Sequence, residues 1–315
     1  MTPGNTAEAA APAFGNLLVP LDGSRLAESV LPLAAGLALR WHARLTLLHV
    51  LEADAPTTIH GKPHLADAES AAAYLAGVAS GLAVSGVEVA THVHPNLERD
   101  VAASIVGHAV ELSNDLVVLA THGSGGLRDV IAGSIAQQVL RRGQTPVLLT
   151  RPTSLAPAGA PAPSIGRVLV PLDGTHDSEL ALAIAEKIAL AWQAALSLLR
   201  VVPTRGSLAG DKAAVATMLP AATAATLNLE QEAAVEYLED VATGPASRGL
   251  RVTISVLRGD PATIVPEEVR RQGADFVVLA THGRAGLGAF WQGSIGSRLA
   301  ERVDVPLLIL RLSEG

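Results

Sequence analysis

The sequence predicts an α/β protein built from two tandem domains, each a five-stranded, Rossmann-like parallel sheet with helices on both faces. One observation is a repeated segment, DLVVLATHG at 115–123 and DFVVLATHG at 275–283. Another is LVPLDG, present at 18–23 and again at 169–174. Apolar runs also alternate with helical patterns through both halves, as in sheets whose strands are linked by helical crossovers. Repetition at about half the chain length indicates two copies of one fold.

The composition fits a two-domain protein that carries no broad basic surface. The 315 residues are 49% apolar, and 23 Lys and Arg face 30 Asp and Glu, for a net charge of -7. Such an acidic chain, with 3% aromatic residues, is not expected to bind nucleic acid. The absence of cysteine excludes disulfides and thiolate sites. No leader and no membrane-spanning run are apparent, so we expect a cytoplasmic protein without membrane association.

The first half contains five predicted strands. The apolar run at 16–23 ends at Pro20 and turns at Asp22, and Ser24 then caps a helix to about Trp41 that Pro32 should kink. A strand at 45–51 and a loop at 52–64 follow. The later elements are a helix with an apolar face, a strand at 87–93, a helix at 101–112, a strand at 116–120, a helix at 134–142 and a strand at 145–150. That apolar face consists of Ala71, Leu75, Val78 and Leu82.

Residues 152–166 are rich in proline and small residues without periodicity, which predicts an extended linker. We therefore expect one domain at 14–151 and another at 167–312. The second half carries nine extra residues between its second and fourth strands, in a loop near 203–220 and a long helix after it. In that helix we expect Leu227, Ala234, Leu238 and Val241 to face inward, and Glu230, Glu232, Glu236 and Glu239 to face solvent.

Ligands of parallel α/β sheets bind beyond the carboxyl ends of the strands. Those ends lie at Asp22, Val50 and Ala120 in the first half, and at Asp173, Val201 and Ala280 in the second. Each repeated strand is followed by a glycine and, after nine further residues, by a Gly-Ser pair that precedes a helix. Free backbone N–H groups at a helix start attract anions. The pattern predicts a phosphate site in each half.

The segments VPLDGS, LATHG, the later Gly-Ser and the final PVLL or PLLIL strand resemble the universal stress protein family, and the resemblance covers both halves. It implies a tandem member with a fold like that of the adenine nucleotide alpha hydrolases. The nucleotide-binding branch of the family carries G-x-x-G-x9-G-[S/T]. Here Ala120 and Ala280 replace the first glycine, which adds a methyl group where backbone approaches the ligand.

By this resemblance the ligand is ATP, with or without Mg²⁺, or another adenine nucleotide. Asp22 and Asp173 would lie against the nucleoside, and the glycines and serines would hold the phosphates, with Arg284 as a further partner for phosphate charge. The expected binding residues are Pro20, Asp22, Val50, Ala120, Gly123, Gly133, Ser134 and Ile135 in the first half, and Pro171, Asp173, Val201, Ala280, Gly283, Arg284, Gly293, Ser294 and Ile295 in the second.

Several structural alternatives stay open for these residues. The two serines are also ordinary helix caps, and the two aspartates are also ordinary turn residues. His122 and His282 have no nucleophile or carboxylate at a triad-like position, so no catalytic residue is assigned. No histidine spacing is typical of a metal site, and His92 with His94 is the pair to check.

The expected function is that of a stress-response regulatory protein that binds nucleotide, with slow ATP hydrolysis at most. The alternatives are an interaction module that keeps only the fold, and an enzyme that hydrolyses or transfers phosphate. We also expect the second half to bind nucleotide better, because Arg284 follows its loop glycine where Ser124 follows that of the first half, whose loop also contains Asp129.

The last strand of each half, at 146–150 and 306–310, is apolar and should end its sheet. Pairing these two edges buries both. We therefore expect an intramolecular pseudo-dimer about a two-fold axis, and a homodimer of two chains stays open.

Overall fold

The structure, a computed structural model, describes residues 12–53, 58–59, 62–63, 65, 67–121, 135–151, 160–208, 211–282 and 295–312. The strands of the first half are β1 (Asn16–Pro20), β2 (Arg44–Glu52), β5 (Val89–Glu98), β6 (Leu116–Ala120) and β7 (Val147–Thr150). Those of the second are β8 (Arg167–Pro171), β9 (Ala195–Val202), β10 (Val252–Arg258), β11 (Phe276–His282) and β12 (Leu307–Leu312). Two short strands, β3 (Thr58–Ile59) and β4 (Lys62–Pro63), pair antiparallel in a separate sheet.

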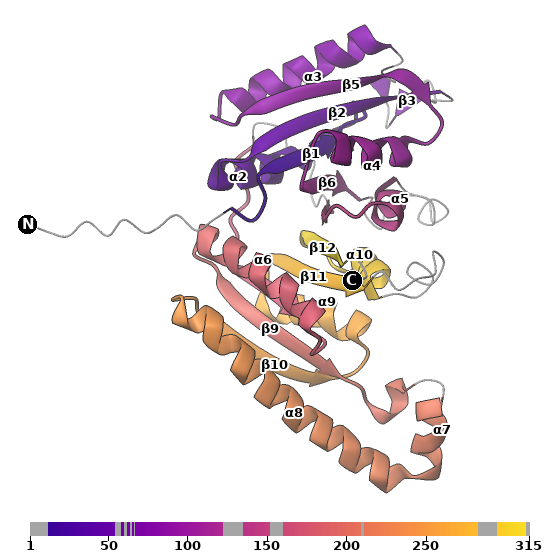
Figure 1. The fold of residues 1–315 in the computed structure, drawn as a ribbon, viewed down its shortest axis with the longest axis vertical. Coiled ribbons are helices and arrows are strands. Elements are labelled where there is room, and N and C mark those ends of the chain that lie inside the picture. Colours follow the sequence, from indigo (N-terminus) through magenta and orange to yellow (C-terminus); the bar gives the residue numbers. More distant parts are fainter. Residues whose placement is uncertain are drawn as a thin grey trace, which may run out of the picture.

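These ten strands form one sheet in the order β10-β9-β8-β11-β12-β7-β6-β1-β2-β5 (Figure 1). All pairs within each half are parallel. The predicted fold class, two five-stranded parallel α/β units, is confirmed. Leu17, Leu18 and Val19 are fully buried in β1, as expected for a strand covered on both faces.

The helices cover the sheet in two layers. The first half contains α1 (Arg25–Glu28), α2 (Leu31–Trp41), α3 (Ala68–Ala83), α4 (Val101–Glu111) and α5 (Ile135–Arg142). The second contains α6 (His176–Trp192), the 3-10 helix η2 (Arg205–Ser207), α7 (Asp211–Met218), α8 (Pro220–Ser247), α9 (Pro261–Gln272) and α10 (Ile295–Arg302). Side chains of α2, α3, α6 and α8 join one hydrophobic cluster with Leu17 and Val19, and those of α4, α5, α9 and α10 join another with Leu18.

The single kinked helix expected from Ser24 to Trp41 is wrong. The structure has two helices, α1 and α2, separated at Ser29 and Val30. Pro32 is the cause, because it has no N–H to donate back to Glu28 and its ring crowds the preceding turn. It lies in the first turn of α2, where a missing N–H costs little. The second half has no proline there, and α6 is continuous from its cap Thr175.

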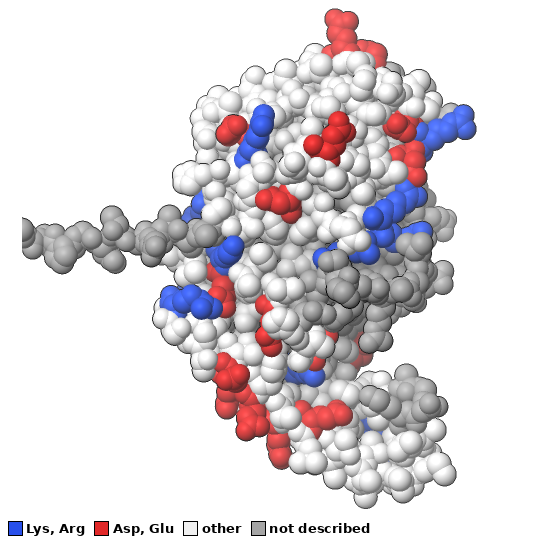
Figure 2. Space-filling view, in the orientation of Figure 1, with Lys and Arg blue, Asp and Glu red and all other residues white. Residues whose placement is uncertain are grey.

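The long helix of the second half is confirmed as α8, and the structure adds η2 and α7 before it. Leu227, Ala234 and Leu238 are buried, and Val241 packs against the core. The four glutamates expected to face solvent are exposed. Figure 2 shows acidic side chains along the outer surface of this helix. In the first half, the apolar face predicted for α3 buries Ala71, Leu75 and Leu82.

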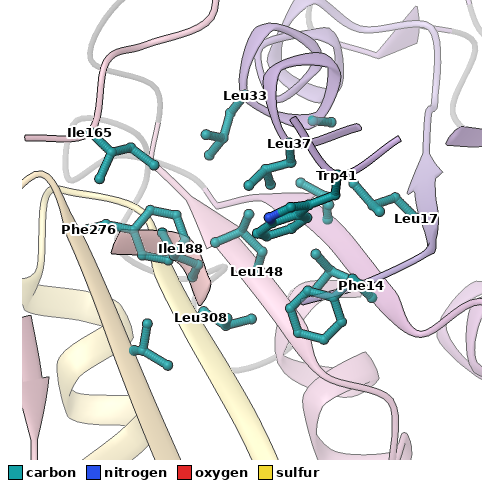
Figure 3. Close-up of a cluster of buried hydrophobic side chains, with 14 of the residues drawn as sticks. Phe14, Leu17, Leu33, Leu37, Trp41, Leu148, Ile165, Ile188, Phe276 and Leu308 are labelled. Atoms are coloured by element: carbon teal, nitrogen blue, oxygen red, sulfur yellow. The ribbon is translucent and has the colours of Figure 1, made fainter. Parts of the chain in front are cut away.

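The two halves join through their last strands. β7 and β12 are antiparallel, and Leu148 lies opposite Leu308, with Val147 opposite Ile309 and Leu149 opposite Leu307. Each half contributes the same position to the central pair, so the approximate two-fold axis passes between Leu148 and Leu308. Figure 3 shows the buried core around these side chains. The predicted pairing of the two edges is confirmed.

The helices beside this seam also meet. Trp41 ends α2, Trp192 ends α6, and their rings contact edge to face with centroids 5.9 Å apart. The guanidinium of Arg40 lies 5.0 Å from the Trp192 ring and donates to the carbonyl of Ala191. Phe14 packs against Trp41 from the other side, with centroids 5.8 Å apart. On this face of the sheet the seam is therefore closely packed and largely aromatic.

Candidate ligand site at the carboxyl ends of the strands

The structure brings the predicted strand-end residues to one edge of the sheet in each half. β6, β1 and β2 are neighbours, so Ala120, Pro20 and Val50 lie at adjacent strand ends. The N–H of Leu21 donates to the carbonyl of Leu48 at 2.8 Å, which places Asp22 directly beyond the sheet. In the second half β11, β8 and β9 are neighbours, and Leu172 donates to Leu199 at 2.8 Å in the same way.

Asp22 and Asp173 each form the turn that leads into a helix. The Asp22 carboxylate accepts from the N–H of Ser24 at 2.8 Å, and Ser24 in turn caps α1 by accepting from the N–H of Ala27 at 3.1 Å. Between them Gly23 has φ 83°, a conformation that favours glycine. The structural role of the aspartate as a turn residue is therefore realised in the structure.

The second half builds the same turn with additional hydrogen bonds. Asp173 accepts from the N–H of Thr175 at 3.0 Å and from its hydroxyl at 2.5 Å. Thr175 caps α6 by accepting from the N–H of Ser178 at 3.2 Å, and Gly174 has φ 80°. Since the LVPLDG repeats carry the same Asp-Gly turn, their close similarity has a structural cause as well as any functional one.

A tyrosine–glutamate pair stands beside each of these turns, and the sequence analysis missed both. The hydroxyl of Tyr74 on α3 donates to Glu28 at 3.0 Å, and that of Tyr237 on α8 donates to Glu179 at 3.2 Å. Burial and the negative charge of Glu28 raise the pKa of Tyr74, to which Asp22 also contributes. Burial and the charge of Glu179 raise the pKa of Tyr237 to about 12. The sequence offered one clue to these pairs, since the chain has only two tyrosines and each half contains one of them.

The two sites differ in the side chain that the neighbouring strand, β2 or β9, places against the backbone just before the turn. In the first half His49 is buried, and its Nδ1 lies 2.7 Å from the Leu21 carbonyl. In the second half Arg200 takes this place, and its guanidinium donates to the Leu172 carbonyl at 3.4 Å. Burial acts to raise the pKa of Asp173, but the hydrogen bonds from Thr175 and Ser178 and the charge of Arg200 outweigh it, so the pKa is lowered.

The space next to each turn glycine is also filled differently. A methyl group built on Gly174 would lie 2.9 Å from Nη1 of Arg200, whereas one built on Gly23 would lie 3.1 Å from Cδ1 of Leu65. A cation therefore borders the second site and an apolar side chain borders the first. Neither Arg200 nor Leu65 was singled out from the sequence, because each reaches the turn through the tertiary structure.

The glycine-rich loops are only partly described. The strands β6 and β11 reach the half-buried residues Ala120 and Ala280, and α5 and α10 begin at Ile135 and Ile295, directly after the two Gly-Ser pairs. The predicted strands before these loops and helices after them are thus confirmed. The phosphate-binding residues predicted within the loops lie outside the described residues, as does His122. They are Gly123, Gly133, Ser134, Gly283, Arg284, Gly293 and Ser294.

A cavity of about 340 Å³ lies in the second half, next to the end of β9. It opens between η2, α7 and α8, the elements that contain the extra residues of this half. Its lining is mainly apolar, and Glu230 is the charged residue on it; the other lining residues are Pro203, Leu208, Val215, Ala222, Thr223, Thr226 and Leu227. Sequence reasoning placed a loop here and did not predict a cavity.

Two general properties of the described part of the chain bear on function. Within it, no group of three or more histidine, aspartate or glutamate side chains has the geometry to hold a metal ion. None of its helices is both long and apolar enough to cross a membrane.

Two copies of a parallel α/β unit, each with an Asp-Gly turn after its first strand and a Gly-Ser pair directly before its last helix, define a tandem protein of Rossmann-like type. The model of the universal stress protein family matches residues 13–151 and 164–311, so the chain belongs to this family. A universal stress protein of Mycobacterium tuberculosis is 28% identical over 94% of this chain and 97% of its own. Universal stress protein YxiE of Bacillus subtilis is 29% identical over 44% of this chain and 99% of its own.

Solved structures agree on the fold over nearly the whole chain. The crystal structure of a universal stress protein from Archaeoglobus fulgidus has a TM-score of 0.67 at 15% identity, covering 96% of this chain and 97% of that one. A functionally unknown protein from Pseudomonas aeruginosa has a TM-score of 0.65 at 18% identity, with 95% and 93% covered. At these identities the likeness establishes the fold.

Proposed function

We propose that this chain is a cytoplasmic stress-response protein that binds ATP or another adenine nucleotide at the strand carboxyl ends of each half. The observation that carries the proposal is the repeated turn, Asp22-Gly23-Ser24 and Asp173-Gly174-Thr175, at the edge of the sheet where α/β proteins bind ligands. The glycine pattern that resembles the nucleotide-binding branch of the family begins at the neighbouring strand in both halves.

The chemistry of the residues suits a nucleotide better than an uncharged ligand. Each aspartate uses one carboxylate oxygen in the turn, which leaves the other to accept from a nucleoside hydroxyl or amine. The Gly-Ser pairs precede helices whose first N–H groups attract phosphate oxygens. No general base is assigned near either turn, so binding without rapid turnover is the proposed activity.

An interaction module without nucleotide is the second candidate, and two features favour it. Ala120 and Ala280 stand where the motif of the nucleotide-binding branch has its first glycine. Leu65 and Arg200 also lie close against Gly23 and Gly174, which reduces the free space beside each turn. In this reading the tandem fold presents a surface to another protein and needs no ligand.

Thermal unfolding of the full chain distinguishes the two. A ligand at 100 times its dissociation constant stabilises a one-site native state by about 2.7 kcal/mol, and a domain of this size gains roughly 2–4 °C per kcal/mol. We expect ATP with Mg²⁺ to raise the melting temperature by several degrees. The double variant Gly133→Val with Gly293→Val should lose this response, because a β-branched side chain blocks close approach of a phosphate.

The matched control is Gly77→Val on α3, where an added side chain meets nothing within 4 Å. It should leave the melting temperature nearly unchanged or slightly raised, because glycine is a poorer helix former than valine, and it should keep the ATP response. No shift of the wild type at millimolar ATP would reject the nucleotide proposal and leave the interaction module. Steady-state release of phosphate, measured on the same samples, would reveal hydrolysis as the third possibility.

A further inference from the structure

Three histidines of the first half meet on one face of the sheet. His92 and His94 lie two residues apart on β5, and the ring of His108 on α4 reaches both, with centroid distances of 4.8 Å to His92 and 4.9 Å to His94. The pair singled out from the sequence therefore has a third member, which comes from a helix. We call these three residues the histidine cluster.

The cluster is held in place by hydrogen bonds and by the sheet. His108 is buried, and its Nδ1 donates to the Ser104 carbonyl at 2.8 Å. His94 donates from Nε2 to Glu98 at 3.0 Å. In the β2–β5 ladder His92 pairs with Leu48 and His94 with Val50, both of which belong to the core under α4. The cluster thus forms part of the contact between α4 and the outer strands.

The charged groups around the cluster only partly favour a positive charge. Burial lowers the pKa of His92 from 6.5, as do His108 and His94, while the charge of Glu111 acts in the opposite direction. Glu98 contacts His94, and Glu52 at the end of β2 lies opposite Glu98 in the strand register. At the start of α4, Asp100 is already paired with Arg142 of α5.

The second half has no histidine at the equivalent positions. Ser255 pairs with Leu199 as His92 pairs with Leu48, and Leu257 pairs with Val201 as His94 pairs with Val50. Glu268 on α9 takes the place of His108, eight residues after the aspartate that precedes each helix. Glu268 is buried, and hydrogen bonds from Arg271 lower its pKa, so it stays ionised between pH about 5.5 and about 7.5.

We propose that His92, which lies in a cluster with His94 and His108, takes up a proton in mild acid and thereby loosens the packing of α4 against β5 in the first half alone. A proton on His92 places a positive charge on a ring whose centroid lies 4.8 Å from that of the buried His108, inside a partly buried contact. Neutral imidazoles pack there at no such cost. The proposal is independent of nucleotide binding, since it concerns the face of the sheet and not the loops.

The sign of the effect follows from linkage. The pKa of His92 is lower in the folded protein than its ordinary value of 6.5, so below about pH 6.5 the unfolded state binds more protons than the folded state. The free energy of opening this region therefore falls as the pH falls through that interval. Each pKa unit of difference corresponds to about a tenfold change in the opening equilibrium.

Hydrogen exchange of the full chain tests this, with the second half as an internal control. Exchange is measured by mass spectrometry at about pH 7.5 and about pH 5.5 and corrected for the intrinsic rate. Peptides from 89–111 should lose protection in acid, by up to about tenfold for the titration of His92, because pH 5.5 lies about one unit below its ordinary pKa of 6.5. Peptides from 252–272 should keep theirs within about twofold.

Two variants and one control assign the effect to the cluster. His108→Gln keeps a donor for the Ser104 carbonyl and removes the imidazole that lowers the pKa of His92, and His92→Ser introduces the residue of the second half; each should reduce the loss of protection in acid. His176→Gln, a histidine whose side chain is 89% exposed, should not change it. Equal losses in both halves, or an undiminished loss in both cluster variants, would overturn the proposal.

Discussion

Arg151 and Arg311 cap helices across the seam between the two halves. Arg151 follows β7, and its Nη2 donates to the carbonyls of Ala300 and Glu301 at the end of α10, at 3.0 and 2.6 Å. Arg311, at the equivalent position on β12, donates from Nη1 to three carbonyls at the end of α5. Because the last carbonyls of a helix lack partners and carry partial negative charge, each half satisfies a helix end of the other.

Replacing either arginine should weaken the whole molecule. We expect Arg151→Ala or Arg311→Ala to lower the free energy of unfolding by about 1.5–3 kcal/mol, the range for hydrogen bonds to charged groups. Urea denaturation measures this. The control is Arg44→Ala, which removes an exposed contact of 3.7 Å with Glu88 and should cost about 0.5 kcal/mol or less. Equal costs for Arg151 and Arg44 would contradict the capping role.

The two tyrosines should resist ionisation in the folded protein. Burial and the glutamate partners raise the pKa of both, to about 12 for Tyr237. In an absorbance titration we expect little tyrosinate at about pH 11, where an unfolded tyrosine with a pKa near 10 is mostly ionised. Since the folded state keeps protons that the unfolded state loses, stability should fall as the pH rises from about 10 to about 12. Ionisation near pH 10 in the native protein would show that the hydroxyls are free.

The turn glycine of the second site should not accept a side chain. Gly174 has φ 80°, and an added methyl group would lie 2.9 Å from Arg200. We expect Gly174→Ala to cost about 1–2 kcal/mol from backbone strain, and to move the guanidinium away from Asp173. Gly77→Ala, in the interior of α3 with nothing within 4 Å, should instead stabilise the protein by about 0.5–1 kcal/mol. Urea denaturation of the wild type and the two variants measures these changes in the free energy of unfolding.

If the nucleotide proposal holds, the second half should bind ATP more tightly. Arg200 borders its turn, and Arg284 follows its loop glycine, whereas Leu65 and Ser124 hold the corresponding places in the first half. Calorimetry on the full chain should show Asp173→Ala reducing ATP affinity more than Asp22→Ala does. A larger loss for Asp22→Ala would reverse the assignment.

Much of the fold could be predicted because its signals are local. The LVPLDG repeat predicted the first strand and its turn in each half, and the apolar spacing of Ala71, Leu75 and Leu82 predicted the buried face of α3. The break between α1 and α2 was missed because helical periodicity continues on both sides of it. Pro32 was recognised, but whether a proline kinks a helix or separates two depends on which end packs against the sheet.

The candidate site was predicted in outline and missed in detail for a similar reason. Strand ends were predictable, since every parallel strand ends at the same edge. Tyr74 meets Glu28, and His108 meets His92 and His94, only because a helix folds back onto a distant strand. The spacing of residues along the chain does not predict such contacts.

The sequence by itself determined that the chain folds as two α/β units, because repeated apolar runs and Asp-Gly turns specify strands and their ends through near neighbours alone. Only the tertiary structure decided that Leu148 and Leu308 meet on the two-fold axis, that Arg151 and Arg311 cap each other's helices, and that Arg200 stands beside Asp173 while Leu65 stands beside Gly23. These contacts depend on the angle and register at which whole elements pack. That geometry follows from the summed burial of many side chains, and no short segment encodes it.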